Sequence, residues 1–356
     1  MPTAPPRARK PRDPAVYLTY GLLVFGALLL LVPFYWMLSN SLKTEAEASK
    51  IPPTLLPLAS YAEFESGRFE VSVSEQDDDA GTVRIKIEAG DAALPPLELA
   101  EGEPAPPPDR AQPRIGDTFV VGQDEVVRGL TPRWDNYPQS LERMDFMNAL
   151  ANTTVITTLS VLGQIISSSL VGFGFARFRF RGRNFLFLLM LSTMMLPPQV
   201  SMIPLFIGFR NLGMIDTIWP LVLPMWLGTP FYVFMFRQFF SQVPEELVEA
   251  ARIDGASNLM IYSRLMLPLS TPVIAIVAIY TFMFTWNDFL GPLIYLSAPE
   301  MRTLALALNA FNGQYGVSDV QMLMAASFVT MLPCIVLFFA AQRYFVDTGA
   351  SSGLKG

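Results

Sequence analysis

Residues Phe146–Ala176 read FMNALANTTVITTLSVLGQIISSSLVGFGFA and include no Asp, Glu, Lys or Arg. The hydrocarbon core of a bilayer is about 30 Å thick, and about 20 apolar helical residues are enough to cross it. This stretch is longer than that. It therefore predicts one transmembrane helix, and the rest of the chain can be searched for others of the same kind.

Five other stretches are equally free of charged residues and long enough to cross a bilayer. They are Pro14–Leu42, Asn184–Phe209, Thr217–Phe236, Leu265–Asn287 and Val320–Gln342. We therefore expect an all-α polytopic membrane protein with six transmembrane helices, the first in residues 15–42 and the other five in residues 146–342. The first apolar run is longer than that of a signal peptide, so it is interpreted as an uncleaved span.

The composition excludes several classes of protein. The 356 residues are 51% hydrophobic and 16% charged, with a mean hydropathy of +0.37, whereas a soluble domain is about 25% charged. The chain has no His and one Cys, which excludes His-ligated metal sites, Ser-His and Cys-His catalytic centres and disulfides. A net charge of −6 gives no reason to expect nucleic-acid binding. No Gly-x-x-x-x-Gly-Lys-Ser/Thr motif occurs, so we expect this chain to bind no nucleotide. We also expect it to bind no metal or other cofactor and to have no catalytic residue.

Basic residues gather in every second short loop, which predicts the orientation of the chain. The N-terminal tail (residues 1–14), the loop Arg177–Arg183 and the loop after the fourth helix carry them, whereas the intervening short loops hold only Arg210 and Arg302. Cytoplasmic loops are enriched in Lys and Arg. We therefore expect both termini, including a C-terminal tail of residues 343–356, to be cytoplasmic.

Residues 43–145 form a long extracytoplasmic segment with a different chemistry. Its central part, residues 59–131, contains 16 acidic and 6 basic residues, a net charge of −10. Polar and apolar residues alternate in Phe69–Glu75 and in Thr82–Glu88, with the turn Gln76–Gly81 between them, which predicts a β-hairpin. Two weaker strand candidates and a Pro-rich acidic segment, expected to be extended or mobile, are Phe119–Val121, Val126–Val127 and Leu94–Pro113. We expect a small β-rich outer module with few apolar residues. It is either a tolerated loop expansion or a contact surface for an outer partner.

The loop Ser241–Pro268, between the fourth and fifth helices, is expected to contain two short helices. Residues Pro244–Gly255 predict the first, because Pro suits the start of a helix and Gly its end; the second is expected from Ser257 to about Met266. The first helix has an apolar side formed by Leu247, Val248, Ala251 and Ile253. Such a helix either lies on lipid or docks on a partner protein. Its acidic residues suit an anionic membrane surface poorly, which favours the partner.

Residues within this loop resemble the EAA loop of binding-protein-dependent ABC importers. Glu249-Ala250-Ala251 is followed after three residues by Gly255 and after nine more by Leu265, and Leu267-Pro268 completes the pattern. The family usually has Ile at the position of Leu265. In that family the loop is the coupling helix that sits in a cleft of the cytoplasmic ATPase subunit. The resemblance therefore implies an ATPase contact made by Glu249, Ala250, Ala251, Asp254, Gly255, Leu265, Leu267 and Pro268.

Four further stretches resemble the carbohydrate-type permeases of this family, the branch of the maltose, glycerol-3-phosphate and multiple-sugar importers. They are Pro33–Lys43, Leu196–Pro204, Trp286–Tyr295 and Arg343–Val346. The resemblance implies a permease subunit in the bacterial inner membrane that forms half of a pathway for a sugar or related polyol. It also implies a second homologous permease, two ATPase subunits that bind ATP and Mg²⁺, and an extracytoplasmic sugar-binding protein, with membrane lipid around the helices. Residues 59–131 have no counterpart in the resemblance, which resumes at Trp134.

Charged residues are scarce in the expected helices, which bears on the mechanism. The main alternative, an ion-coupled carrier or channel, normally keeps ionisable groups near the membrane midplane. Asp288 lies 20 residues beyond Pro268, about 30 Å along a helix, so we expect it near the outer surface. Trp286, Asn287 and Asp288 are candidates for the outer mouth of a pathway, or else mark an exposed helix end. A permease for amino acids or phosphonate is the second alternative and would share the mechanism.

Three further features of the sequence are each compatible with two interpretations. Prolines interrupt the third and fourth helices, either as hinges for alternating access or as plain kinks. Trp219, Trp226 and Trp286 either anchor helices at the membrane surface or stack on sugars. Residues Gly349–Gly356 are either a frayed end or an extended tail between two ATPase subunits.

Overall fold

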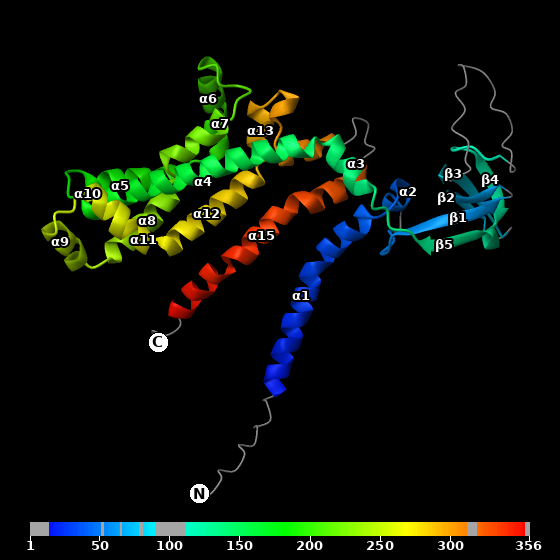
Figure 1. Ribbon diagram of the computed structural model, residues 1–356, viewed down its shortest axis with the longest axis horizontal. Helices are drawn as coiled ribbons and strands as arrows, with labels where there is room; N and C mark the ends of the chain where they lie inside the picture. The colour runs from blue at the N-terminus through cyan, green and yellow to red at the C-terminus, as the bar shows by residue number, and fades with distance from the viewer. Residues whose placement is uncertain are drawn as a thin grey trace, which may run out of the picture. The chain divides into compact units, whose positions relative to one another are not determined.

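The computed structural model describes residues 14–50, 53–64, 66–77, 81–89, 112–311 and 319–352 (Figure 1). Its contacts divide the chain into two units. The first comprises Met1–Ser140 and Ser318–Phe328, and the second comprises Leu141–Val317 and Val329–Gly356. All the described strands belong to the first unit, and the helices from α4 to α14 belong to the second.

The outer part of the first unit is one antiparallel sheet with the strand order β4-β3-β2-β1-β5. Its strands are β1 (Leu58–Phe64), β2 (Gly67–Asp77), β3 (Thr82–Ala89), β4 (Thr118–Gly122) and β5 (Val126–Leu130). β2 and β3 pair in the register Val71 to Ile87, so the predicted hairpin is confirmed. β4 and β5 confirm the two weaker candidates, whereas β1 was not predicted. Residues 90–111, which hold most of the Pro-rich segment, lie outside the described residues.

The sheet curls, because its two outermost strands follow each other directly in the chain. Only the three residues of η1 (Gln123–Glu125) separate β4 from β5, although these strands lie at opposite edges. Phe64 on β1 accordingly meets Phe119 on β4, with ring centroids 5.1 Å apart. One face of the sheet buries a core made of Ala62, Phe69, Val71, Val83, Ile85, Ile87, Phe119 and Val121. Although we expected few apolar residues in this module, alternating positions on four strands give it a core of its own.

A buried polar cluster joins the end of α1 (Pro14–Ser41) to the segment that leads into the sheet. The Nζ atom of Lys43 donates to the carbonyl oxygen of Thr54 at 2.5 Å. The Nδ2 atom of Asn136 donates to the carbonyl oxygens of Ser41 and Lys43 at 2.9 and 2.8 Å. Lys43 is only 1% exposed, and this burial lowers the pKa of its ammonium group. These bonds fix the point at which the outer segment leaves the first membrane helix.

Short helical segments follow α1, and the second unit is almost entirely helical. The remaining helices are α2 (Glu45–Ala48), α3 (Asn136–Arg143), α4 (Phe146–Arg177), α5 (Arg183–Ser192), η2 (Thr193–Met195), α6 (Pro198–Asn211), α7 (Trp219–Val222), η3 (Leu223–Leu227), α8 (Pro230–Gln242), α9 (Glu245–Ile253), α10 (Asn258–Ile261), the π-helical η4 (Tyr262–Met266), α11 (Leu267–Leu269), α12 (Thr271–Trp286), α13 (Leu290–Tyr295), η5 (Pro299–Met301), α14 (Leu304–Ala307), η6 (Leu308–Phe311) and α15 (Val320–Ser352).

Between four and six of the described helical segments can cross a membrane by length and composition. Four do so as long helices. Two other expected helices are bent, by 97° between Arg183–Met195 and Pro198–Asn211 and by 77° between Asn258–Leu269 and Thr271–Trp286. Proline accompanies both bends, because Pro198 is the first residue of α6 and Pro272 the second residue of α12. A helix tolerates proline in its first turn but not in its interior. The expected count of six is reached if each bent pair crosses the membrane as one span, and it is four if only the long helices do.

The expected C-terminal tail is helical rather than extended over most of its length. Helix α15 continues past Gln342 to Ser352. The interpretation as an extended tail concerned Gly349–Gly356, and the described part of that segment, Gly349–Ser352, is helical in the isolated chain. Gly353–Gly356 lie outside the described residues.

Helix α4 is the centre of the second unit and packs along α8, η3 and α12. Glycines on α4 allow the close approach: a Cβ at Gly172 would lie 2.7 Å from Cβ of Phe236, and one at Gly163 would lie 2.3 Å from the ring of Trp226. Trp226 also donates from Nε1 to the carbonyl oxygen of Leu159 at 3.1 Å. This tryptophan therefore packs on α4, which explains why the neighbouring position is glycine.

Candidate coupling loop and membrane cavity

The predicted first helix of the loop Ser241–Pro268 is α9, so this part of the prediction is confirmed. Pro244 is the N-cap, with φ −53° and ψ 138°, one position earlier than a first helical residue. Glu245 and Glu246 occupy the first turn. Acidic side chains there stabilise the positive end of the helix dipole, which helps a helix of this length to form.

Gly255 ends α9 in a Schellman motif. The N–H of Gly255 donates to the carbonyl oxygen of Arg252 at 3.0 Å, and the N–H of Ala256 donates to that of Ala251 at 2.9 Å. The motif needs a residue in the left-handed conformation after the helix, and Gly255 has φ +81°. A Cβ on Gly255 would meet nothing within 4 Å. The requirement for glycine is therefore one of backbone conformation and not of space.

Helix α9 is attached to the rest of the second unit by one side only. Val248 is 3% exposed and belongs to a buried apolar cluster with Phe173, Phe236, Phe240, Ile261, Tyr262, Met266, Val273 and Val277. Leu247 and Ile253, which we expected on the same apolar side, are instead 47% and 86% exposed. The helix therefore has an inner anchor at Val248 and an outer face that carries two uncovered aliphatic side chains.

The predicted coupling residues divide between these two surfaces. Three of them pack against the buried cluster: Ala251, Leu265 and Leu267. The other five are exposed: Glu249, Ala250, Asp254, Gly255 and Pro268. The structure thus brings the eight residues into one loop, but gives some of them an anchoring position and leaves the others free to meet a partner.

The second half of the loop is fixed to α4. Ser257 caps α10, because its Oγ atom accepts a hydrogen bond from the N–H of Met260 at 3.3 Å. The hydroxyl oxygens of Tyr262, in η4, and Ser169, in α4, lie 2.7 Å apart in a buried hydrogen bond. The ring of Tyr262 also packs on that of Phe173, with centroids 5.4 Å apart. A displacement of the loop would therefore act directly on α4.

Arg177, the last residue of α4, was not predicted as part of this site. Its Nη2 atom donates to the carbonyl oxygens of Phe240 and Val243, each at 2.6 Å. These carbonyls lie at the end of α8, just before α9. The sequence showed Arg177 only as the first of several basic loop residues, and no local pattern could indicate which carbonyls it reaches.

The three residues expected at the outer mouth of a pathway have separate roles. Trp286 is buried, donates from Nε1 to the carbonyl oxygen of Thr330 at 3.1 Å and stacks on Phe282. Asn287 donates from Nδ2 to the carbonyl oxygen of Met283 at 2.8 Å. Both therefore pack or cap rather than line an open space. Asp288 lines a cavity.

This cavity has a volume of about 260 Å³ and is mostly apolar. It lies where the bent pair α5–α6 and the broken segment α7–η3 meet the end of α12 and α13. Its lining includes Pro198, Gln199, Ser201, Phe284, Asp288 and Tyr295. Apolar walls with a few polar groups are typical of sites for small organic molecules.

A family model described as "Binding-protein-dependent transport system inner membrane component" matches residues 168–348. The chain belongs to this family. The match includes α9, its glycine cap and the membrane cavity, so the resemblance inferred from the loop is confirmed. Members of the family are the membrane components of transport systems, and this permease is accordingly a transport subunit and not an enzyme.

Two curated relatives of the permease are named as permeases of sugar transport systems. It is 38% identical over 205 residues to the arabinooligosaccharides transport system permease protein AraQ of Halalkalibacterium halodurans, which covers 58% of this chain and 73% of the relative. It is 35% identical over 226 residues to the melibiose/raffinose/stachyose import permease protein MelC of Bacillus subtilis, covering 62% and 80%. The carbohydrate branch of the family is therefore confirmed.

A solved structure shares the fold of the permease. A chain of a bacterial ABC transporter involved in the import of the acidic polysaccharide alginate superposes with a TM-score of 0.65 at 18% identity. The match covers 95% of this chain and 99% of that one. At this identity the match shows the fold of an ABC importer permease and nothing about the substrate.

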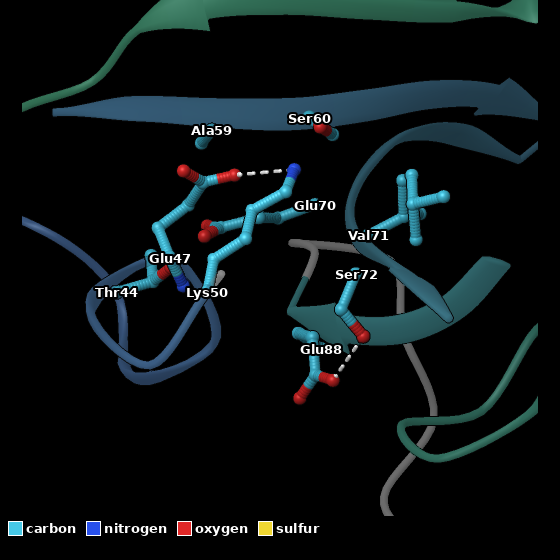
Figure 2. Close-up of a pocket in the computed structure, with 10 residues that line it drawn as sticks. Thr44, Glu47, Lys50, Ala59, Ser60, Glu70, Val71, Ser72 and Glu88 are labelled. Carbon is cyan, nitrogen blue, oxygen red and sulfur yellow. Dashed lines mark hydrogen bonds and ion pairs between the residues drawn. The ribbon is translucent and has the colours of Figure 1, made fainter. Parts of the chain in front are cut away.

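The outer module of the permease has a polar cavity of about 200 Å³ between α2 and the sheet (Figure 2). Figure 2 shows Glu47 facing Lys50, at 3.6 Å, and Ser72 donating to Glu88, at 2.6 Å. Glu70 pairs with Arg133; burial raises the pKa of Glu70, and the Arg133 charge opposes that shift. These charged and polar side chains therefore pair with one another within the module. No group of His, Cys, Asp or Glu residues in the described ranges could hold a metal ion.

Proposed function

We propose that this permease forms half of the membrane pathway of an ATP-driven importer for a sugar or related polyol, and that α9 couples it to a cytoplasmic ATPase. The observation that carries the proposal is the two-sided placement of α9. Val248 fixes the helix inside, while Ile253 stands 86% exposed on the opposite surface. An aliphatic side chain of that size gains from burial, at about 25 cal/mol per Å² of apolar area. A partner surface that covers Leu247 and Ile253 would supply that gain.

The connection from α9 to the membrane supports transmission of movement. Arg177 holds the end of α8, and Tyr262 holds the second half of the loop to α4. ATP-driven closure of two ATPase subunits would displace α9, and these contacts would pass the displacement to α4. The pathway could then switch between inward-facing and outward-facing states. This chain needs no nucleotide site for that step, because ATP and Mg²⁺ are bound by the partner subunits.

The membrane cavity supports an uncharged, polar substrate class. Aromatic and aliphatic walls suit the apolar faces of a sugar ring, and Gln199, Ser201 and Asp288 offer hydrogen-bonding groups for its hydroxyls. The names of the two relatives refer to arabinooligosaccharides and to melibiose, raffinose and stachyose, which agree with that class. We propose that Asp288 contributes to the pathway, while Trp286 and Asn287 support the helices around it.

The remaining partners follow from the family. We propose a second homologous permease as the other half of the pathway and an extracytoplasmic sugar-binding protein as the donor of substrate. The basic loops favour an orientation with both termini in the cytoplasm, which places α9 on the ATPase side and the β-sheet module outside. Arg177 and the start of α9 then lie on the same side of the membrane, which agrees with the hydrogen bond from Arg177 to Val243, just before α9.

Cysteine labelling tests the contact with the ATPase. Ile253→Cys is introduced into a Cys334→Ser chain, and its reaction with a maleimide is timed with and without the ATPase subunits. We expect the subunits to slow the labelling strongly. Leu130→Cys, an exposed apolar position on β5, is the matched control and should react at one rate in both samples. Equal labelling of the Ile253→Cys chain in both samples would exclude the proposed docking face.

A further inference from the structure

The loop between α4 and α5 gathers exposed arginine and phenylalanine side chains. It reads Phe178-Arg-Phe-Arg-Gly182 and is followed by Arg183 at the start of α5. Arg179 and Arg181 are exposed. The phenylalanines beside them are also uncovered: Phe178 is 40%, Phe180 44% and Phe185 68% exposed.

The positive charges of this loop have no acidic partner among the described residues. No Asp or Glu occurs between Asp145 and Asp216, and none of the ion pairs in the described part of the chain involves Arg179, Arg181 or Arg183. Arg183 makes a 3.4 Å hydrogen bond to the carbonyl oxygen of Phe178. The loop arginines therefore differ from Arg177, whose guanidinium donates hydrogen bonds to the carbonyl oxygens of Phe240 and Val243 at the end of α8.

A fourth positive charge from α8 adds to the same region. The guanidinium of Arg237 lies 3.9 Å from the ring centroid of Phe187, in α5, and is close enough to Arg183 for the two charges to repel each other. Its Nε atom is buried and makes no hydrogen bond to the described residues. Because like charges close together disfavour each other, and no acidic group among the described residues is paired with them, a bound anion would stabilise this pair.

The loop encloses a hollow of about 410 Å³ on the surface of the second unit. It is lined by Arg179, Phe180, Gly182, Arg183, Asn184 and Phe185. The hollow thus combines two guanidinium groups, which bind phosphate through paired N–H donors, with two aromatic rings. That combination suits a ligand with a phosphate at one end and an apolar body at the other.

The position of the hollow indicates that the phosphate of its ligand belongs to a membrane lipid. Helix α4 is one of the long candidate membrane helices, and α5 begins one of the bent pairs, so the short loop between them lies where the chain leaves the bilayer. At that depth, arginines meet lipid headgroups while phenylalanine rings reach the upper acyl chains. A purely electrostatic contact with a protein or a free phosphate would leave the three phenylalanines uncovered.

We propose that the hollow formed by Arg179, Phe180, Arg183 and Phe185 is a binding site for the headgroup of an anionic phospholipid. The phosphate accepts hydrogen bonds from Arg179 and Arg183, Arg181 and Arg237 add to the local positive potential, and the phenylalanines cover the glycerol and first acyl carbons. The bound lipid neutralises the arginine cluster and stabilises the hairpin of α4 and α5. The site requires no ATPase and does not depend on the coupling role of α9.

Native mass spectrometry of the full chain, purified in detergent, measures this site. Phosphatidylglycerol and phosphatidylcholine with identical acyl chains are titrated separately. We expect wild-type protein to bind phosphatidylglycerol more tightly, and Arg179→Gln/Arg181→Gln to weaken that binding by about thirtyfold, since each basic residue at an anionic surface contributes about a factor of five. Arg179→Lys/Arg181→Lys keeps the charge and should retain most of the affinity. The control Arg210→Gln/Arg302→Gln removes the same charge from other loops and should leave the affinity unchanged.

Several results would overturn the proposal. One is equal binding of the two lipids by wild-type protein, which needs no variant to be stable. A second is an equal loss of phosphatidylglycerol binding in the Arg210/Arg302 control. A third is displacement of the lipid by inorganic phosphate at matched concentration, which would identify a simple anion site. A fourth is loss of ATPase assembly with unchanged lipid binding in Arg179→Gln/Arg181→Gln, which would assign the loop to a protein partner.

Discussion

Arg177 donates a hydrogen bond from Nη2 to the carbonyl oxygen of Val243, 2.6 Å away, and so joins the end of α4 to the residue that precedes the N-cap of α9. The same nitrogen also bonds the carbonyl oxygen of Phe240. Helix ends leave such carbonyls without an intrahelical partner. A single guanidinium therefore closes α8 and sets the position from which α9 begins.

Loss of this guanidinium should uncouple ATP hydrolysis from transport. Hydrogen bonds from a charged donor contribute about 1.5–3 kcal/mol each, so Arg177→Met should free the start of α9 and lower the sugar imported per ATP hydrolysed. Arg177→Lys can reach one carbonyl and should give an intermediate ratio. Uptake and hydrolysis are measured together in proteoliposomes with the complete importer. A wild-type ratio in Arg177→Met would show that the bonds to α8 have no part in coupling.

Substitutions at Gly255 should follow backbone conformation and not side-chain size. The residue has φ +81° and open space around its missing Cβ. Asn tolerates the left-handed region, whereas a left-handed residue with a Cβ costs about 1–2 kcal/mol and a β-branched one more. Gly255→Asn should therefore keep most of the uptake, and Gly255→Val should lose it at normal membrane expression. If both variants transport alike, the Schellman cap is not required.

The pair Gly172 and Gly174 offers a matched test of packing on α4. A Cβ at Gly172 would lie 2.7 Å from Cβ of Phe236 and 3.1 Å from the backbone nitrogen of Arg237, so α4 and α8 would have to separate. A Cβ at Gly174 meets nothing within 4 Å, and Ala is favoured over Gly in a helix by about 1 kcal/mol. Gly172→Ala should lower the thermal unfolding temperature in detergent, and Gly174→Ala should maintain or raise it. The reverse order would contradict the close helix contact.

The outer module should be removable without loss of the membrane core. Leu58 pairs with Leu130 at the base of the sheet, and the N–H of Thr131 donates to the carbonyl oxygen of Pro57 at 3.1 Å. The two ends are therefore adjacent, and a short Gly/Ser linker can replace residues 59–131. We expect the shortened chain to reach the membrane and assemble.

Transport by this shortened chain then distinguishes the two interpretations of the module. Unchanged uptake would mark a tolerated expansion, while weaker apparent affinity for the loaded binding protein, with unchanged basal ATP hydrolysis, would mark a contact surface. Absence of the complex from the membrane would contradict both.

Local chemistry made much of this fold predictable. Stretches without charged residues indicated the membrane segments, and the alternation of polar and apolar residues indicated β2 and β3. Pro244 and Gly255 indicated the start and the end of α9. The bends at Pro198 and Pro272 were harder, because a proline in an apolar run is compatible with a kink as well as a break. Strand β1 was missed because its buried positions are Ala59, Ser60 and Ala62, residues without a strong strand preference.

The fold of the candidate loop was predictable, but its two faces were not. The family resemblance selected eight residues of the loop, yet it could not separate the anchored Ala251 from the exposed Ala250. That separation depends on α4 and α8, which are distant in the sequence. For the same reason the roles of Arg177 and of buried Trp286 were not visible: their partners, Val243 and Thr330, are 66 and 44 residues away.

Coupling through α9 is tested most directly by substrate uptake with Ile253→Asp in proteoliposomes that contain both permeases, the ATPase and the loaded binding protein. Ile253 is 86% exposed, so the substitution should leave expression and thermal stability unchanged. Val120→Asp, on an exposed position of β4, is the control for an added charge. We predict that Ile253→Asp abolishes ATP-driven uptake and that Val120→Asp does not. Normal uptake by Ile253→Asp, at normal expression and assembly, would contradict the assignment of α9 as the coupling helix.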